Sequence, residues 1–144
     1  MLFRSQNSKD NTPAVVHFEI VEGDGVEVIC AAKGGGSENK SKFYALNPSD
    51  SIVDWVIKTV PTMGAGWCPP GMLGIGIGGT AEKAMLMAKE SLMEPIDMAD
   101  LLARGPSSKL EELRIDLYEK VNALGIGAQG LGGLTTVLDV KIST

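Results

Sequence analysis

Cys68 is the residue whose type and surroundings best suit chemistry. It lies in the run Gly64-Ala-Gly-Trp-Cys-Pro-Pro-Gly71, between a helix-like segment and a glycine-rich one. The two prolines that follow it lack backbone N–H groups and favour an extended backbone, so we expect the sulfur to point out of any regular strand pairing. A thiolate presented in this way suits a metal ion or an iron–sulfur cluster. Cys68 is therefore the predicted metal and cofactor ligand.

A second candidate site is the segment Lys33-Gly-Gly-Gly-Ser-Glu-Asn-Lys-Ser41. Its spacing does not fit the phosphate-loop motif, because Asn39 stands before Lys40 where the motif requires glycine. Lysines flank three glycines whose backbone N–H groups no side chain covers, and such a nest binds carboxylate or phosphate groups. A flexible loop without a ligand is the alternative. The predicted anion-binding residues are Gly34, Gly35 and Gly36.

The other glycine patterns and the second cysteine receive no role in binding. The dinucleotide fingerprint G-x-G-x-x-G occurs at 74–79 and at 125–130, but neither copy has the strand before it and the helix after it that the motif needs. Cys30 alternates with Val26 and Val28, so we predict a small buried structural residue. His17 is a lone histidine on a predicted strand and is assigned no function.

Composition excludes several classes of protein. The chain has 144 residues and a net charge of -5, and its lysines and arginines are not clustered, so a nucleic-acid partner is not expected. Two cysteines are too few for a disulfide framework, which favours a reducing compartment. No run approaches the roughly 18 apolar residues of a membrane span. We predict a cytoplasmic protein that does not contact a membrane.

The elements that must position Cys68 follow from periodicity and capping signals. Alternating residues predict a β-hairpin from 16 to 32 and strands at 73–77 and 136–142. Helical periodicity predicts helices at 52–60, from 81 until Pro95, at 98–103 and at 110–124, with Thr80 as the cap of the second and Ser108 as the cap of the fourth. The order is ββαβαααβ, an α+β fold with a short mixed β-sheet packed against amphipathic helices. Residues 1–12 are a predicted disordered lead-in, and 13–144 a single domain.

Three long motifs, in one order, give the chain a family resemblance. They are Lys33–Ser41, the run Gly66-Trp-Cys-Pro-Pro-Gly-Met-Leu-Gly-Ile-Gly-Ile-Gly-Gly-Thr80, and Gly125-Ile-Gly-Ala-Gln-Gly-Leu-Gly-Gly133. From about Asn11 to Ile142 the sequence closely resembles class I, iron–sulfur-dependent fumarate hydratases and the related L(+)-tartrate dehydratases. Three ordered motifs are far more specific than any single glycine pattern.

The resemblance implies a hydro-lyase that adds water to, or removes it from, a small dicarboxylic acid, as between fumarate and malate. It also implies a four-iron four-sulfur cluster that is held by three cysteines and acts as a Lewis acid through its open iron. By resemblance, Cys68 is one of these ligands and the run from Gly34 to Gly36 is the loop for a substrate carboxylate. Three further residues lie in the family's site motifs: Asn39, Lys40 and Gln129.

The same resemblance implies that much of the site lies outside this chain. Cys30 matches no ligand position, and the other two cluster cysteines would stand before residue 1 and after residue 144. We therefore expect a central fragment of the alpha (N-terminal) region, inactive alone. Its partners would be a dicarboxylate substrate, the remaining alpha region, a beta region or subunit, and further copies in a homo-oligomer. An L(+)-tartrate dehydratase alpha subunit and a non-enzymatic module that binds an anion or a nucleotide are the alternatives.

Overall fold

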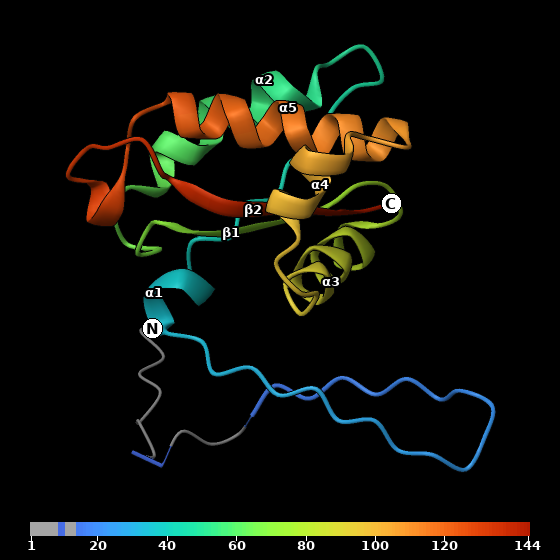
Figure 1. The fold of residues 1–144 in the computed structure, drawn as a ribbon. Helices are drawn as coiled ribbons and strands as arrows, with labels where there is room; N and C mark the ends of the chain where they lie inside the picture. Colours follow the sequence, from blue (N-terminus) through green and yellow to red (C-terminus); the bar gives the residue numbers. More distant parts are fainter. Residues whose placement is uncertain (1–8, 11–13) are drawn as a thin grey trace.

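Two parallel strands packed between helices form the centre of the computed structural model (Figure 1). The structure describes residues 9–10 and 14–144. Helix α5 lies over one face of the sheet and α3 under the other (Figure 1). This arrangement confirms the predicted α+β class. The elements in order are α1 (Gly35–Glu38), α2 (Ile52–Thr59), the 3-10 turn η1 (Val60–Met63), β1 (Gly71–Gly76), α3 (Ala81–Ser91), α4 (Met98–Arg104), α5 (Lys109–Ala123), the 3-10 turn η2 (Ala128–Gly130) and β2 (Val137–Ser143).

The helices begin where the sequence provides caps. The hydroxyls of Thr80 and Ser108 accept hydrogen bonds from the N–H groups three residues later, at 3.4 and 3.2 Å, as predicted. Helix α2 begins at Ile52, as predicted, and Ser51 is its cap. The chain also continues through Pro61 as the turn η1 rather than ending before it, since proline is tolerated in the first turn of a helix.

The sheet is parallel, whereas a mixed sheet was predicted. In its register Leu73 lies opposite Val140 and Ile75 opposite Ile142. Parallel strands are normally buried on both faces, because their connecting helices cover the sheet. Strand β2 follows this rule, with Asp139 and Lys141 buried, while Leu138 is 43% exposed.

Two glycines of the first fingerprint have a packing role. A Cβ atom at Gly74 would lie 2.2 Å from the carbonyl oxygen of Ala88, and one at Gly76 would lie 1.9 Å from that of Ala84. Both contacts are far closer than real carbon atoms permit. These glycines let α3 lie directly against β1, which explains the glycine spacing without a nucleotide.

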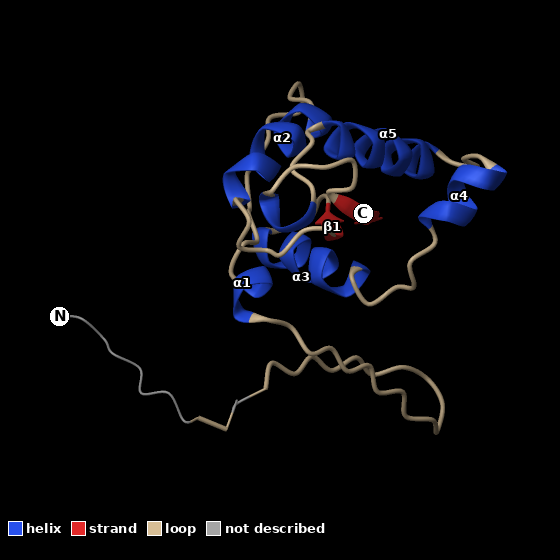
Figure 2. Cartoon of the chain, turned by 60° about the vertical axis from the view of Figure 1, so that its left-hand side comes forward, coloured by secondary structure: helices blue, strands red, loops and turns tan. Residues whose placement is uncertain are grey.

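The predicted N-terminal hairpin is not formed. Residues 14–22 and 26–34, here called the two arms, run side by side away from the helices and contain no strand (Figure 1, Figure 2). Phe18 is 91% and Ile20 98% exposed, and Cys30 is exposed rather than buried as predicted. Alternation stabilises a strand pair only when its apolar face is covered, and nothing in the described chain covers the arms.

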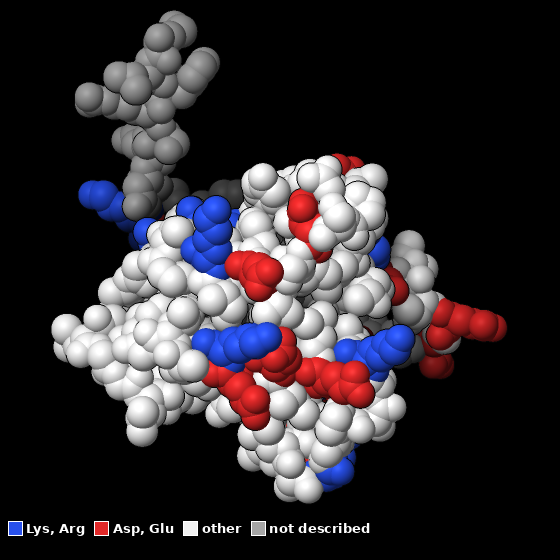
Figure 3. Space-filling model, turned by 90° about the horizontal axis from the view of Figure 1, so that it is seen from above, with Lys and Arg blue, Asp and Glu red and all other residues white. Residues whose placement is uncertain are grey.

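The proposed lead-in, residues 1–12, falls largely on positions 1–8 and 11–12, which lie outside the described residues. It stays a prediction, as does the single domain over 13–144. No helix in the described part of the chain is long and apolar enough to cross a membrane. On the face seen from above, lysines and arginines alternate with acidic side chains, so neither charge gathers there in one large patch (Figure 3).

Candidate functional site

Three glycine-rich motifs that are far apart in the sequence meet around Cys68. We call residues 64–70, which join η1 to β1, the cysteine loop. From the first motif, Gly36 lies so close that a Cβ atom there would be 2.2 Å from the carbonyl oxygen of Gly66. From the third motif, the N–H of Gln129 donates to the carbonyl oxygen of Pro69 at 2.6 Å. The cysteine loop is therefore the contact point of all three.

Cys68 is exposed at the surface of this loop. Its φ is +59°, a left-handed conformation that non-glycine residues rarely adopt, so the predicted extended backbone is wrong at this position. Its N–H donates to the carbonyl oxygen of Ala65 at 2.9 Å, which closes a tight turn. The residues on either side, Trp67 and Pro69, are buried. The thiol is thus accessible while its neighbours anchor the backbone.

The predicted glycine nest is a single turn of helix, α1, with Gly34 as its extended N-cap. The Ser37 hydroxyl donates to the carbonyl oxygen of Gly34 at 3.0 Å, and the Asn39 amide donates to that of Gly35 at 2.8 Å. Asn39 therefore closes the turn with its side chain. The first N–H groups of a helical turn have no partner within it, so those of α1 face the start of the turn as donors.

Lys40 lies against the cysteine loop. A Cβ atom at Gly66 would lie 2.5 Å from Cε of Lys40, so this side chain runs along the backbone of the loop. Lys33 and Lys89 both pair with Glu38, and the Lys89 ammonium, more than Lys33, holds the pKa of the Glu38 carboxyl below its usual range. Within the described residues Lys40 forms no ion pair. Its charge is available to a ligand.

Gln129 is the contribution of the third motif. Its φ is +54°, and its side chain is exposed beside the cysteine loop. Gly130 adjoins the same loop, because a Cβ atom there would lie 3.0 Å from Cβ of Ala65. Two non-glycine residues in the left-handed conformation thus lie at this contact. Gln129 donates the hydrogen bond to Pro69, and Cys68 directly precedes Pro69. Backbone strain of this kind tends to cluster at functional sites.

Trp67 was missed by the sequence analysis. It is 7% exposed, and its Nε1 has no hydrogen-bond partner among the described residues. A Cβ atom at Gly71 would lie 3.0 Å from Cζ3 of Trp67, so the ring lies against the start of β1. The available signal was the tryptophan itself, one of only two in the chain, placed directly before the candidate ligand. Its ring anchors the cysteine loop in the core.

A cluster of four charged residues joins α4, α5 and β2, and the sequence analysis did not predict it. Arg114, Asp139 and Lys141 are buried, whereas the side chain of Asp97 is 42% exposed. Asp139 accepts hydrogen bonds from the N–H groups that begin α4, at 2.9 and 3.2 Å, and pairs with Arg114 at 3.1 Å. Arg114 and then Lys141 hold the pKa of the Asp97 carboxyl well below its usual range. Two cations balance two anions, and each is bonded, so this cluster stabilises the fold.

The described residues can supply one ligand to an iron–sulfur cluster. No group of three His, Cys, Asp or Glu side chains within them could hold a metal ion, and Cys30 lies on an exposed arm. Cys68 alone fits, because its thiol is exposed at the surface of the cysteine loop. Such a cluster needs further thiolates, which this chain does not provide at the site.

The sequence of this chain is similar to one protein family and to several named proteins. The family described as fumarate hydratase (Fumerase) matches residues 1–144. A protein of Methanocaldococcus jannaschii, provisionally named L(+)-tartrate dehydratase subunit alpha, is 44% identical over 120 residues, which cover 81% of this chain and 40% of that protein. The L(+)-tartrate dehydratase subunits alpha of Escherichia coli K12 and Shigella boydii are each 31% identical over 142 residues, covering 96% of this chain and 45% of theirs.

The chain belongs to the fumarate hydratase (Fumerase) family. The resemblance that the three motifs predicted, to the alpha region of these enzymes, is thereby confirmed. The chain spans 40% to 45% of the length of the relatives named above.

Proposed function

We propose that this chain is part of a hydro-lyase that hydrates or dehydrates a small dicarboxylic acid. Membership of the fumarate hydratase family supports this activity, and relatives named as L(+)-tartrate dehydratase subunits support the dehydration of a hydroxy diacid equally. The observation that carries the proposal is the meeting of all three family motifs at the cysteine loop. The reactions share one chemistry, in which water adds to or leaves a carbon chain between two carboxylates.

In this proposal Cys68 is one of three thiolate ligands of a four-iron four-sulfur cluster. The cluster, when bound, supplies a Lewis acid toward the substrate's oxygen atoms. The exposure of the thiol supports this role. The remaining thiolates, the catalytic acid and the catalytic base come from the rest of the alpha region and from a beta region or subunit.

The segment from Gly34 to Lys40 holds one carboxylate of the substrate. Free N–H groups at the start of α1 and the unpaired Lys40 ammonium both favour an anion. Lys40 lies along the cysteine loop at Gly66, so an anion that it binds is held at this loop. Gln129 adjoins the same loop from the other side and is a candidate to donate a hydrogen bond to the substrate.

The test of this role is a titration with malate, phosphate and NAD, followed by thermal unfolding. A ligand at 100 times its dissociation constant stabilises the native state by about 2.7 kcal/mol. Lys40→Met should remove most of any stabilisation by malate, because the mutant lacks the unpaired cation. Lys42→Met is the matched control, since Lys42 is exposed, and it should leave the response unchanged.

The same titration separates the enzyme fragment from a non-enzymatic binding module. Stabilisation by NAD, independent of Lys40, would favour the module. Stabilisation by malate that Lys40→Met and Lys42→Met weaken equally would place the anion elsewhere and contradict the carboxylate site.

A further inference from the structure

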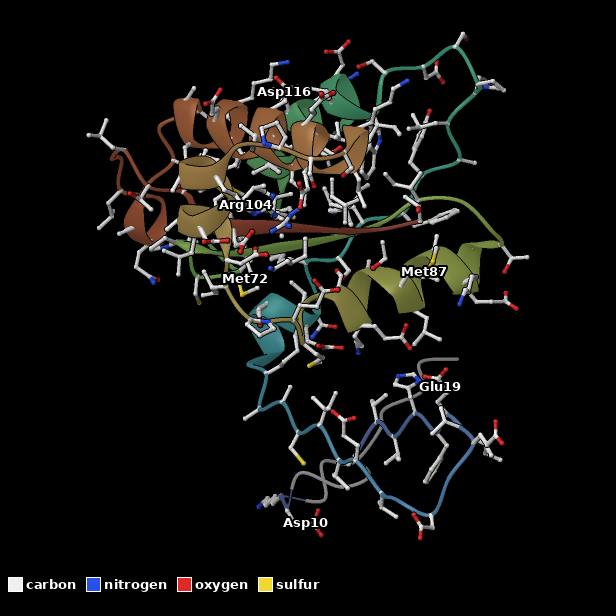
Figure 4. The ribbon with its side chains drawn as sticks, turned by 45° about the vertical axis from the view of Figure 1, so that its right-hand side comes forward. Asp10, Glu19, Met72, Met87, Arg104 and Asp116 are labelled. Carbon is white, nitrogen blue, oxygen red and sulfur yellow. The ribbon has the colours of Figure 1, made fainter. Side chains whose placement is uncertain are left out.

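A pocket away from the cysteine loop lies between α2 and residues 44–50, which precede this helix. Its volume is about 480 Å³, within the range of roughly 300–1,000 Å³ that is typical of small-molecule sites. In Figure 4, α2 lies on the same side of the sheet as Asp116 of α5, whereas Met87 of α3 lies on the other side. The described residues that line the pocket all lie outside the three family motifs.

The wall that α2 contributes is one face of the helix. Asp54, Trp55, Lys58 and Thr59 line the pocket, and residues three or four positions apart are neighbours on a helix surface. The ring centroid of Tyr44, from the loop, lies 6.0 Å from that of Trp55. Tyr44 is 61% exposed and Trp55 is half-buried. The two rings therefore present an aromatic surface to a ligand.

Two opposite charges in the wall have no partner. Asp54 and Lys58 stand four positions apart on α2, with the acid nearer the N-terminus, a spacing that favours an ion pair. Acid–base pairs with the same spacing on α4 and α5 do form ion pairs, at 3.4 and 2.8 Å. Within the described residues Asp54 and Lys58 pair neither with each other nor with another side chain. Both charges are available to a ligand.

Asp50 is the remaining charged residue of the wall, and its carboxylate is already bonded. Its Oδ2 accepts hydrogen bonds from the backbone N–H and the side-chain amide of Asn47, at 2.7 and 3.1 Å. The unpaired charges are therefore one carboxylate and one ammonium. A ligand with a single charge would be attracted by one of them and repelled by the other, whereas a ligand with both charges can be attracted by both.

We propose that this pocket binds a free α-amino acid with an aromatic side chain. The ammonium and the carboxylate of such a ligand stand on one carbon atom and face Asp54 and Lys58, whose Cβ atoms lie about 5–6 Å apart at this helical spacing. The side chain of the ligand packs against Tyr44 and Trp55, because aromatic rings attract one another in offset or tilted contacts. The pocket shares no lining residue with α1 or the cysteine loop, so this site does not depend on the proposed hydro-lyase function.

The test is an NMR titration of the isotope-labelled 144-residue chain with L-phenylalanine. We expect saturable shifts of amide signals in residues 44–62, the segment that lines the pocket. Three analogues each lack one recognised group: phenethylamine lacks the carboxylate, phenylpropionate lacks the ammonium and glycine lacks the side chain. Phenethylamine and phenylpropionate should each bind about tenfold more weakly, because each loses a hydrogen bond between charged groups. Glycine should bind more weakly as well, because it cannot contact the two rings.

Substitutions in the wall test the same contacts from the protein. Asp54→Asn and Lys58→Met should each weaken the binding of L-phenylalanine about tenfold. Glu82→Gln and Lys83→Met are the matched controls, because both residues are exposed on α3, under the other face of the sheet, and they should leave binding unchanged.

The absence of a saturable shift with L-phenylalanine would overturn the proposal, and so would shifts confined to residues outside 44–62. Equal binding of phenethylamine or phenylpropionate would show that the pocket does not recognise both charges. Equal effects of the wall and control substitutions would place the ligand elsewhere.

Discussion

At Gly36 the absence of a side chain decides whether α1 can touch the cysteine loop. The backbone of Gly36 meets the carbonyl of Gly66, and Lys40 then lies along that loop. Two of the predicted substrate residues are thus placed by a contact between two glycines. The sequence pattern showed the glycines as open N–H groups, but it could not show that one of them fits against a second motif.

Gly36→Ala should weaken this contact, because the new methyl group would lie 2.2 Å from a backbone oxygen that has little room to move. We expect a loss of about 1–3 kcal/mol in the free energy of unfolding, or release of α1 from the loop. Urea unfolding followed by the fluorescence of the chain's tryptophans measures the first, and hydrogen exchange at residues 35–40 measures the second.

Gly34→Ala is the control, since a Cβ atom at Gly34 meets nothing within 4 Å and its φ of -69° suits alanine. Equal effects of the two substitutions would show that the contact between Gly36 and Gly66 does not hold the motifs together.

For Cys68, the role could be predicted from the sequence but the backbone conformation could not. Its type and its proline and glycine neighbours predicted a candidate ligand, and the structure leaves the thiol exposed. The left-handed backbone at Cys68 was not predicted, because it depends on the turn closed by Ala65 and on the buried side chains of Trp67 and Pro69. These are contacts of the folded chain rather than properties of the sequence.

At the scale of elements, helices were predicted better than strands. Thr80 and Ser108 cap their helices as expected, because capping depends on residues three positions apart. Whether the arms pair, or which face of β2 is buried, depends on what covers them. Asp139 and Lys141 look like the solvent side of an alternating strand, yet charged partners from α4 and α5 allow both to be buried.

Asp139→Asn tests that cluster. The substitution leaves Arg114 and Lys141 with one carboxylate between them, and removing one partner of a buried ion pair costs about 3–5 kcal/mol. We expect a loss of that size in the free energy of unfolding, measured with urea. Asp116→Asn removes a carboxylate from an exposed pair with Lys120 and should cost about 0–1 kcal/mol. Similar losses in the two variants would contradict the structural role of the cluster.

At the scale of the whole molecule, we propose that the chain holds part of a site rather than a complete one. Its described residues bring one cysteine, one unpaired lysine and one glutamine to the meeting point of three motifs. The relatives named above are more than twice as long, which leaves ample sequence for the remaining ligands and for the acid and base. The family could be predicted from motif order alone, because order is a property of the sequence.

The purified chain should therefore catalyse neither fumarate hydration nor L(+)-tartrate dehydration. Loss of the fumarate absorbance in an anaerobic assay, after incubation with iron and sulfide, measures the first reaction, and formation of a keto acid measures the second. Turnover by the 144-residue chain, at a rate above that of a Cys68→Ser variant, would show that the site is more complete than we propose.

The most direct test of the central claim, that Cys68 is a cluster ligand, is anaerobic reconstitution with iron and sulfide. Iron content per chain and the charge-transfer absorbance of the cluster would be read in the wild type, in Cys68→Ser and in Cys30→Ser, which is the matched control. Because other thiolates are needed, the measurement is repeated with the full-length enzyme. We predict that Cys68→Ser loses bound iron in the enzyme while Cys30→Ser retains it. Retention of iron by Cys68→Ser, or equal loss in both variants, would contradict the assignment.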